Sequence, residues 1–492
     1  MDEIEVVIGL EVHVQLLTQS KVFCGCPNRF NPDEPNTQVC PVCLGLPGSL
    51  PVLNAEALDL SIRAGLGLGC EIAEVTKWDR KQYFYPDLPK GYQISQYDQP
   101  VCGRGEVTIA TEGRQFTVGI TRAHLEEDAG KTVHGGGVSR VDLNRAGTPL
   151  LEIVTEPDLR SATDARAFLS ELRLLMRYLE VSDCNMQEGS LRCDANVNLR
   201  IPESVHGRGG GEAITPICEV KNLNSFRAVE QAIEHETLRQ QKAFAADGLR
   251  IDSPGALKTT RGFDADRGVT TPQREKEGEA DYRYFPDPDL LPIPISPQHR
   301  TRIEATVCER PADRRRRYVT DLGLGEYDAG VLIDAGRPTA DYFEAAASAG
   351  GDAKAAANWV TQDIAREVND RGVAIGDLPV GPAVLGELLR RVSAGELANK
   401  GAREVFAALL RREATEPSDV AVVIEELGLT PGDDAELEGT ARELVAGNAK
   451  VVDAVRSGKD AAVGPLVGQM MKRHKGANPG AVRELLLNVI RG

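Results

Sequence analysis

The spacing of apolar residues changes along the chain, from alternation in its first part to helical spacing in its second. Up to about residue 295, alternating apolar and polar positions predict strands over residues 6–16, 107–120 and 193–201. Helical spacing predicts helices over residues 162–179 and 225–245, and Ser225 is a suitable N-cap for the second. We therefore expect an α+β fold in this part, dominated by sheet.

The composition shifts to Ala, Leu, Glu and Arg after the segment DPDLLPIPISP, and helical spacing then continues to the end of the chain. The break SAGELANKG marks the start of a last helical unit at NKGAREVFAALLRR. At roughly 150 residues per domain, 492 residues correspond to about three domains. We predict a β-rich domain over residues 1–295, an all-α linker domain over 296–400 and a small all-α tail domain over 401–492.

Two stretches of the first domain show neither the alternating nor the helical spacing and are predicted to be loops. The first is the glycine-rich segment 206–213, and the second, 254–281, is full of charged and small residues. We expect each of them to be mobile.

The net charge of −17 argues against an unselective polyanion binder, but it leaves room for a local basic patch. From Arg442 to the C-terminus there are nine Lys and Arg against four Asp and Glu. This tail is either a nucleic-acid contact or a solvated helical face. The start of the chain is unlike a secretion signal, and no apolar run approaches the length of a membrane span, so we expect a cytoplasmic protein with no membrane partner.

Four of the ten cysteines cluster in the sequence. Cys24 and Cys26 precede a loop rich in Pro, Asn and Asp, and Cys40 and Cys43 follow it. Two such pairs can supply the four ligands of a structural zinc ion, which would stabilise a segment too polar to be held by burial. The alternative is four ordinary buried thiols, in a chain whose cysteines are expected to stay reduced.

Carboxylates occur on the predicted strands at positions where a core strand would not place them. Burying such charges is costly unless they are paired or bind a metal. If these faces converge, their carboxylates would form a site for a hard cation, typically magnesium with a bound triphosphate. The alternative is that the carboxylates form salt bridges between strands. Alternation groups Glu11 with His13, Arg192 with Asp194, Asn196 and Asn198, and Glu219 with Lys221, while Glu126, Glu127 and Asp128 end a further strand.

Signatures of several other enzyme classes are absent from the sequence. AGKT at residues 129–132 lacks the first glycine of a P-loop, GLGLGC lacks the third glycine of the dinucleotide fingerprint, and no Gly-x-Ser-x-Gly occurs. No hydrolytic nucleophile is therefore predicted. By contrast, DRKQYFYPDLPKGYQIS at residues 79–95 combines charges and aromatics with no structural period, which indicates a functional segment.

A series of segments, in order along the chain, resembles the GatB family of the tRNA-dependent amidotransferases, which make Gln-tRNA or Asn-tRNA from the misacylated glutamyl or aspartyl form. The resemblance covers nearly the whole chain, is weakest between about residues 300 and 440, and returns in GPLVGQMMKRHKGANPGAVRELL. The segments before that gap are IGLEVHVQL, CPVCLGLPGSLPVLN, DRKQYFYPDLPKGYQIS, HLEEDAGK, VDLNRAGTPLLEIVTEPD, EGSLRCDANVN, EVKNLNSF and DYRYFPDPDLLP.

The resemblance implies a carbon–nitrogen ligase with a cradle-shaped catalytic domain, a helical linker and a helical tail. ATP, with Mg²⁺, phosphorylates the side-chain carboxylate of the misacylated amino acid, and ammonia then displaces the phosphate. The implied partners are a glutaminase (amidase) subunit that supplies the ammonia, a small third subunit, and misacylated tRNA with its acceptor end at the cradle and its body at the tail.

The resemblance also implies roles for particular residues. Glu11, His13, Glu126 and Glu219 match the catalytic positions that surround the magnesium. The four cysteines, Cys24, Cys26, Cys40 and Cys43, match the zinc-bearing members of the family. The contacts to ATP or tRNA implied by the 79–95 segment are Arg80, Lys81, Tyr83, Tyr85, Lys90 and Tyr92, to which Asp194, Lys221 and Asn222 are added on spacing alone.

Two functions of other classes are weighed against this one. A non-catalytic tRNA-binding scaffold of the same complex needs the basic tail but not the converging Glu and His residues. A stand-alone ligase would obtain ammonia by itself and needs no partner. The sequence does not indicate whether Glu-tRNA, Asp-tRNA or both are used.

Overall fold

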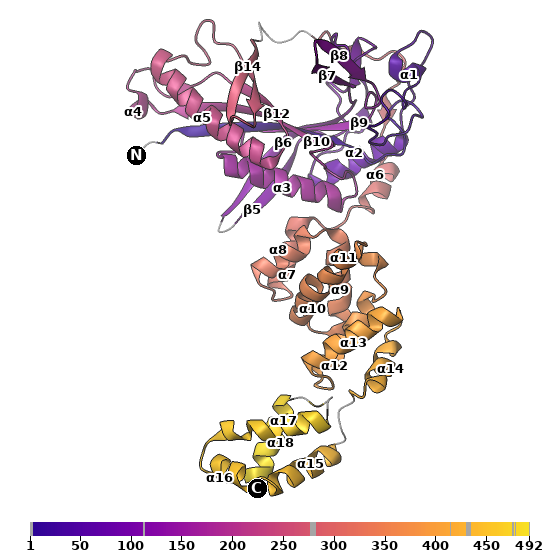
Figure 1. Cartoon of the computed structure of the whole chain (residues 1–492). Coiled ribbons are helices and arrows are strands. Elements are labelled where there is room, and N and C mark those ends of the chain that lie inside the picture. The colour runs from indigo at the N-terminus through magenta and orange to yellow at the C-terminus, as the bar shows by residue number, and fades with distance from the viewer. Residues whose placement is uncertain are drawn as a thin grey trace. The chain divides into compact units, whose positions relative to one another are not determined.

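The structure, a computed structural model, describes residues 3–111, 114–275, 282–413, 415–429, 434–474, 477 and 479–491. The chain divides into two compact units, Met1–Asp313 and Arg314–Gly492 (Figure 1). The first contains every strand of the described residues, and the described elements of the second are helices joined by loops. The α+β prediction, with a sheet-rich first part and a helical second part, is confirmed.

Most of the strands of the first unit join one nine-stranded sheet, in the order β14-β13-β12-β10-β1-β9-β6-β5, with β11 beside β10. Neighbours are antiparallel except β12 and β13. The strands are β1 (Glu5–Gln15), β2 (Val75–Thr76), β3 (Asp79–Gln82), β4 (Tyr92–Ser95), β5 (Gly105–Thr111), β6 (Arg114–Glu127), β7 (Lys131–Gly135), β8 (Val138–Asp142), β9 (Pro149–Thr155), β10 (Leu191–Ile201), β11 (Ala213–Ile214), β12 (Cys218–Leu223), β13 (Thr259–Asp264), β14 (Val269–Glu275), β15 (Phe285–Pro286) and β16 (Ile293–Pro294).

Two long helices, α3 and α5, pack against each other, and α5 lies along β10 and β12 of the large sheet. Ser161 and Ser225 cap them by accepting hydrogen bonds from Asp164 N and Ala228 N, and the cap at Ser225 confirms the prediction. In Figure 1 the hairpin β7–β8 lies at the other end of the first unit from α4 and α5. The helices of this unit are α1 (Pro41–Leu44), α2 (Ala55–Gly67), α3 (Ala162–Tyr178), α4 (Glu203–His206), α5 (Phe226–Asp247) and α6 (Pro297–Glu304).

The core of the first unit lies between the sheet and these helices. Phe168 and Leu172 of α3 and Val229 of α5 are buried there together with the inward residues of β1 and β10. Each fully buried side chain of this size contributes about 1.5–3 kcal/mol. Ile303 of α6 belongs to the same core, so the helix that follows the sheet still packs on the first unit.

Two of the predicted elements were wrong. Residues 107–120 do not form one strand but belong to the hairpin of β5 and β6, whose residues 112–113 lie outside the described part. The predicted loop 254–281 contains β13 and β14, paired antiparallel, and its residues 276–281 lie outside the described part. The other predicted loop is confirmed, because residues 207–212 join α4 to β11 without helix or strand.

The helices after the sheet are short, and none of the described ones is long and apolar enough to span a membrane. A π-helix, Val360–Ile364, joins α10 to α11, and short 3-10 turns occupy Ile375–Asp377 and Asp460–Val463. The α-helices are α7 (Pro311–Thr320), α8 (Glu326–Asp334), α9 (Arg337–Gly350), α10 (Ala353–Trp359), α11 (Ala365–Arg371), α12 (Pro382–Ser393), α13 (Asn399–Arg412), α14 (Ser418–Glu426), α15 (Asp434–Ala446), α16 (Ala449–Arg456), α17 (Gly464–Arg473) and α18 (Pro479–Arg491).

Residues near the predicted boundary at 400 contact the helices that precede it. α13 packs against α12, and the ring of Phe406 lies edge-on to Trp359 with centroids 5.4 Å apart. A separate apolar cluster, which runs from Ala441 to Ile490, joins α15 to α18. The three-part division of the chain therefore stays a prediction, and the core of its tail begins within α15.

Candidate functional site

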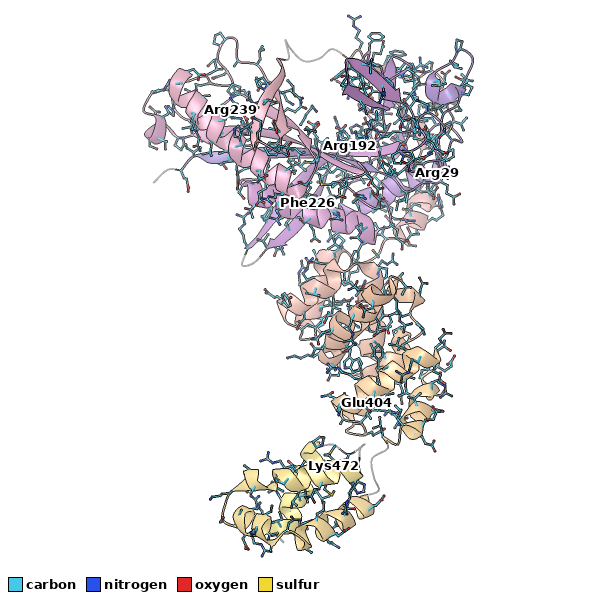
Figure 2. The ribbon with its side chains drawn as sticks, viewed as in Figure 1. Arg29, Arg192, Phe226, Arg239, Glu404 and Lys472 are labelled. Atoms are coloured by element: carbon cyan, nitrogen blue, oxygen red, sulfur yellow. The ribbon has the colours of Figure 1, made fainter. Side chains whose placement is uncertain are left out.

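One face of the central sheet carries polar side chains on five adjacent strands, and we call it the polar face. Side chains alternate along a strand, so β10 buries Leu191, Cys193 and Ala195 on the helix side and turns the residues between them to the other side. Figure 2 shows Arg192, one of these residues, near the middle of the first unit. The face comprises Glu219 and Lys221 of β12, Arg192, Asp194 and Asn196 of β10, Glu11 and His13 of β1, Glu152 of β9, and His124 and Glu126 of β6.

The first cluster of the polar face consists of His13, Glu126 and Glu152, whose ligand atoms all lie within 4.8 Å of one another. The strand register brings them together, because His13 and His124 both stand opposite Glu152 on the neighbouring strands. His13 Nε2 lies 3.3 Å from Glu152 Oε2. His124 Nε2 lies 3.5 Å from a carboxylate oxygen of both Glu126 and Glu152.

Opposite charges within this cluster stabilise one another. Burial alone would lower the pKa of His13, but the hydrogen bond and negative charge of Glu152, with the charge of Glu126, raise that pKa above its ordinary value. Burial would raise the pKa of Glu152, whereas the positive charges of His124 and His13 hold it well below its usual range. Glu152 is therefore an ionised carboxylate in a half-buried position.

The second cluster consists of Glu11, Asp194 and Glu219, again with ligand atoms within 4.8 Å of one another. Lys221 Nζ donates to Asp194 Oδ2 at 2.5 Å and lies 3.4 Å from Glu219 Oε1. Asn196 Nδ2 donates to Glu11 Oε1 at 2.9 Å. Burial would lower the pKa of Lys221, but the charges of Asp194 and Glu219 raise it, so this lysine stays protonated and offsets part of the negative charge.

Each cluster offers the ligand types that bind a divalent cation. The second is made of carboxylates alone, which suit Mg²⁺, and the first adds one imidazole nitrogen. The structure thus distributes the four predicted magnesium residues over two neighbouring groups. His13 and Glu126 belong to the first cluster, and Glu11 and Glu219 belong to the second.

Sequence reasoning missed Glu152 and His124. Glu152 is a lone carboxylate in the apolar strand PLLEIVT, and nothing local distinguishes it from a surface residue. His124 stands two residues before Glu126 on β6, and this spacing was the one signal that could have placed it on the same face.

Lys81 and the tyrosines around it lie close to the first cluster. Lys81 Nζ lies 4.8 Å from the centre of the Tyr282 ring. Burial would lower the pKa of Lys81, but the negative charge of Glu126 and the neighbouring groups raise it, so the ammonium stays charged. Burial raises the pKa of Tyr83 and of Tyr284 to about 12. Lys81 and Tyr83 therefore both interact electrostatically with Glu126 of the first cluster.

Arg80 and Lys90 of the same segment already have carboxylate partners. Arg80 Nε donates to Asp287 Oδ2 at 2.8 Å, and its guanidinium lies 4.3 Å from the centre of the Tyr92 ring. Lys90 Nζ donates to Glu127. These contacts join β3 to Asp287, which follows β15, and join the turn before β4 to β6.

Among the other residues predicted to contact ATP or tRNA, Asp194 belongs to the second cluster and Lys221 contacts it, whereas Tyr85 and Asn222 belong to neither cluster. Tyr85 is 55% exposed, and Phe84 beside it is 87% exposed. Asn222 has a positive φ of 67° and donates from Nδ2 to the carbonyl of Phe263 at 2.9 Å. Asn222 therefore helps to join β12 to β13, whereas its neighbour Lys221 reaches the second cluster.

The three acidic residues at the end of β6 point in different directions. Glu126 enters the first cluster, and Glu127 accepts from the Ile94 amide at 2.8 Å. Asp128 accepts from Arg192 Nη2 at 2.7 Å and from Gln15 Nε2 at 3.0 Å. Burial would raise the pKa of Asp128, but the charges of Arg192 and Arg145 lower it below its ordinary value.

The four clustered cysteines come together as predicted. The Sγ atoms of Cys24, Cys26 and Cys40 lie 3.4 Å, 3.7 Å and 3.7 Å from Cys43 Sγ. Four sulfurs around one zinc at about 2.3 Å would be about 3.8 Å apart, so the spacing fits a tetrahedral centre. The hydrogen bond with Cys24 lowers the pKa of Cys43 to about 4, despite burial, and burial raises the pKa of Cys26 to about 12.

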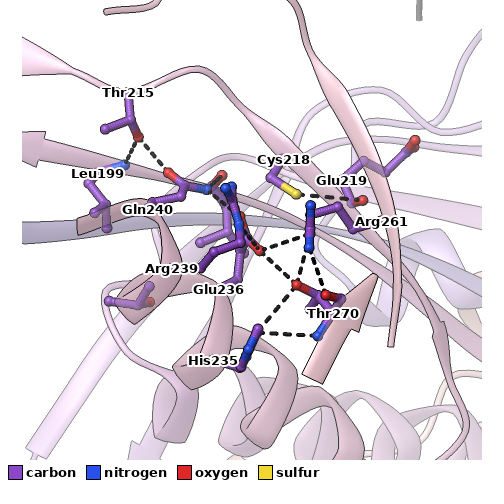
Figure 3. Close-up of polar contacts among 12 residues, drawn as sticks. Leu199, Thr215, Cys218, Glu219, His235, Glu236, Arg239, Gln240, Arg261 and Thr270 are labelled. Atoms are coloured by element: carbon purple, nitrogen blue, oxygen red, sulfur yellow. Dashed lines mark hydrogen bonds and ion pairs between the residues drawn. The ribbon is translucent and has the colours of Figure 1, made fainter. Parts of the chain in front are cut away.

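A further buried polar network lies on the helix side of the sheet (Figure 3). Glu236 of α5 is fully buried and accepts from Arg239, Gln240 and Thr270. Arg261 of β13 lies 3.7 Å from the same carboxylate. Because Thr260, one residue earlier, donates to Glu219 of the polar face, β13 contacts both the second cluster and α5.

Comparison with known proteins places this architecture in a family. The GatB/GatE catalytic domain family matches residues 6–301, and the GatB domain matches residues 341–490. The chain belongs to the GatB family. The B subunit of the aspartyl/glutamyl-tRNA(Asn/Gln) amidotransferase from Rhodopirellula baltica is 51% identical over 490 residues, covering 98% of this chain and 96% of the relative. The proteins of the same description from Trichlorobacter lovleyi and Moorella thermoacetica are 48% and 46% identical, covering 99% and 98% of this chain and 99% of each relative.

The GatB/GatE catalytic domain match contains both clusters of the polar face, the tyrosines around Lys81 and the four cysteines. The polar face is therefore the candidate active site of this GatB-family chain. The GatB domain match contains the helices from α10 to α17 in full.

Proposed function

We propose that the chain phosphorylates the side-chain carboxylate of Glu-tRNA(Gln), Asp-tRNA(Asn) or both with ATP, and then amidates it to give Gln-tRNA(Gln) or Asn-tRNA(Asn). Membership of the GatB family makes the chain part of a tRNA amidotransferase, a ligase that forms carbon–nitrogen bonds. The proposal adds the reaction steps and the residues that carry them.

The observation that carries the proposal is the pair of clusters on one face of the central sheet. Phosphoryl transfer depends mainly on positioning the reactants and on neutralising the charge of the transferred group. Magnesium bound at either cluster would supply this neutralisation. The residues that would hold it are His13, Glu126 and Glu152 in the first cluster and Glu11, Asp194 and Glu219 in the second.

The cations beside the clusters would bind the anionic reactants. Lys81 stays charged next to the first cluster, and Lys221 lies over the second, so an ATP phosphate or the substrate carboxylate would meet a fixed positive charge at either one. Tyr83, Tyr85 and Tyr92 offer aromatic surface for a nucleotide or for the acceptor end of the tRNA. Arg80 and Lys90 would hold this segment in place through Asp287 and Glu127.

Ammonia is proposed to come from a partner, because the sequence indicates no hydrolytic nucleophile that would release it from glutamine. The proposed partners are a glutaminase subunit, a small third subunit and the misacylated tRNA, with the tRNA body on the basic tail. At the cysteine loop we propose one structural zinc, since four protein ligands leave no open position for chemistry.

The test uses the chain with and without its glutaminase subunit. Misacylated Glu-tRNA(Gln) or Asp-tRNA(Asn) is incubated with γ-labelled ATP, and label transferred to the acyl-tRNA is measured as acyl phosphate. We expect transfer to require this chain and Mg²⁺, and amide formation from glutamine to require, in addition, the glutaminase subunit.

Other outcomes would identify other functions. A scaffold would bind the tRNA without transferring label, and a stand-alone ligase would form the amide from glutamine without the glutaminase subunit. Either result would contradict the proposal.

A further inference from the structure

Lys21 is a fully buried lysine beside the four cysteines. Its Nζ donates to the backbone carbonyl of Gln38 at 2.7 Å and to that of Leu143 at 3.5 Å, and it lies 3.7 Å from Cys43 Sγ. Within the described residues, no Asp or Glu oxygen lies within 4.0 Å of this ammonium group. Lys21 is thus a buried cation whose nearest ionisable neighbour is a cysteine.

A buried cation of this kind needs a negative partner. Removing an ammonium group from water is costly, and carbonyl dipoles alone do not supply an opposite charge. Two negative charges remain when four thiolates bind one Zn²⁺, and this excess lies directly against Lys21 in the present geometry. Lysine and metal centre would therefore each lower the cost of burying the other.

We propose that Lys21 is the cationic partner of a zinc centre formed by Cys24, Cys26, Cys40 and Cys43. The lysine raises the affinity of the cysteines for zinc by offsetting the excess negative charge, and zinc in turn makes the burial of the lysine favourable. This inference rests on the zinc site proposed above and adds a residue that the ligand spacing in the sequence does not indicate.

The position of Lys21 also links the metal centre to the candidate active site. Leu143 lies in the turn that leads into β9, the strand of Glu152. The Gln38 amide donates to Asn144 Oδ1 at 2.8 Å, and the Val22 amide donates to the Gly147 carbonyl at 2.9 Å, in the same turn. A purely structural role for Lys21, as a donor that ties the cysteine loop to this turn, is the alternative that an experiment must separate.

The first measurement is zinc affinity, obtained by competition with a chromophoric chelator on the purified full chain. Lys21→Met removes the charge and the donors at similar length, and we expect zinc to bind about 10–100-fold more weakly, as is typical for partners of metal ligands. Lys131→Met, which changes an exposed lysine of β7, is the control and should bind zinc like the wild type. Wild-type affinity in Lys21→Met would overturn the proposal.

A second variant separates charge from hydrogen bonding. Lys21→Gln keeps a donor for the Gln38 carbonyl but carries no charge, so the proposal predicts that it loses zinc affinity as Lys21→Met does. If Lys21 only joins the two backbone segments by hydrogen bonds, Lys21→Gln should instead bind zinc with wild-type affinity. This result would overturn the proposal.

Urea unfolding of the zinc-loaded and chelator-treated forms completes the test. If Lys21 acts through the metal, Lys21→Met destabilises the loaded form and leaves the chelated form unchanged or more stable. Equal destabilisation of both forms would mean that Lys21 is only a structural tie. If metal analysis finds no zinc in the wild type, the proposed zinc site is wrong. This outcome is distinct from a wild type that binds zinc with an affinity that does not depend on Lys21.

Discussion

Glu126 is held in one orientation by two neighbours within the first cluster. Ser95 Oγ donates to its Oε2 at 2.9 Å, and His124 Nε2 lies 3.5 Å from the same oxygen. Glu152 is fixed in a similar way between His13 and His124. Such preorganisation is what a phosphoryl-transfer site requires, because the charges must be in place before the reaction begins.

Glu126→Gln should slow phosphoryl transfer by about a hundredfold while the chain stays folded, because the amide keeps the size of the side chain but loses the charge that binds the metal. The measurement is acyl phosphate formation from labelled ATP in the assembled complex. Glu106→Gln, an exposed carboxylate on β5, is the matched control and should react at the wild-type rate. Wild-type transfer in Glu126→Gln would show that this carboxylate is structural.

The stability of the first unit at acid pH depends on the Asp128 carboxylate. Its pKa is lowered in the folded chain, so the stability it contributes is complete above its unfolded value of about 3.9 and is lost as the pH falls through the lower folded value. Asp128→Asn should cost about 3 kcal/mol at pH 7, because Arg192 and Arg145 lose their partner, and this cost should shrink as the pH falls below about 3.9.

The two tryptophans allow this effect to be measured in the first unit alone. In a Trp359→Phe background, the fluorescence of buried Trp78 reports urea unfolding of the first unit, at pH 7 and at low pH. A stability loss in Asp128→Asn that does not shrink as the pH falls below about 3.9 would contradict the assignment.

At the level of elements, the cysteine loop is polar and short of apolar contacts, so a metal is its natural source of stability. Metal analysis of the purified chain should find about one zinc per chain. Cys43→Ala should lower the stability of the first unit more than it lowers the turnover of the protein that remains folded. A metal-free chain with full activity would show that the proposed zinc site does not exist.

Helix α5 offers a comparison between a buried and an exposed ion pair on the same element. Glu236→Ala should destabilise the first unit by about 3 kcal/mol or more, because Arg239 and Arg261 would lose a buried partner. Glu230→Ala removes a pair with the exposed Arg166 and should cost under about 1 kcal/mol. Urea unfolding followed by Trp78 fluorescence measures both, and equal costs would mean that the buried network contributes no more than a surface pair.

On the scale of the whole molecule, the charge is unevenly distributed. The chain carries −17 in total, but from Arg442 onward it has nine basic and four acidic residues, a net charge of +5 by difference. Helices α15 to α18 have their own apolar core. Because α13 and α14 pack with α12, a truncation before Asp434 should remove the basic tail without exposing the preceding helices.

This truncation should weaken tRNA binding and reduce its dependence on salt, because fewer phosphates would be neutralised. Filter binding of misacylated tRNA across a salt series measures both quantities. Glutamine hydrolysis by the assembled complex without tRNA should persist and serves as the control. Unchanged tRNA affinity would show that the tail serves assembly instead.

The sequence by itself determined the features that depend on neighbouring residues. Alternation located β1 and β10, helical spacing located α3 and α5, with a serine cap for α5, and the spacing of four cysteines predicted a cluster that the fold brings together. Each of these signals is local, because strand pleat, helix period and N-cap are set within a few residues. The family resemblance was equally accessible, since it lies in contiguous segments.

Only the tertiary structure decided which strands lie side by side, and that choice formed the candidate site. Glu152 entered the first cluster because β9 pairs with both β1 and β6, and the four predicted magnesium residues were divided because Glu11 faces Asp194 whereas His13 faces Glu152. The pairing of Arg80 with Asp287, 207 residues away, also depends on the tertiary structure. The physical reason is that the local pattern sets the face of a side chain, whereas its neighbours across a sheet depend on register between segments far apart in the sequence.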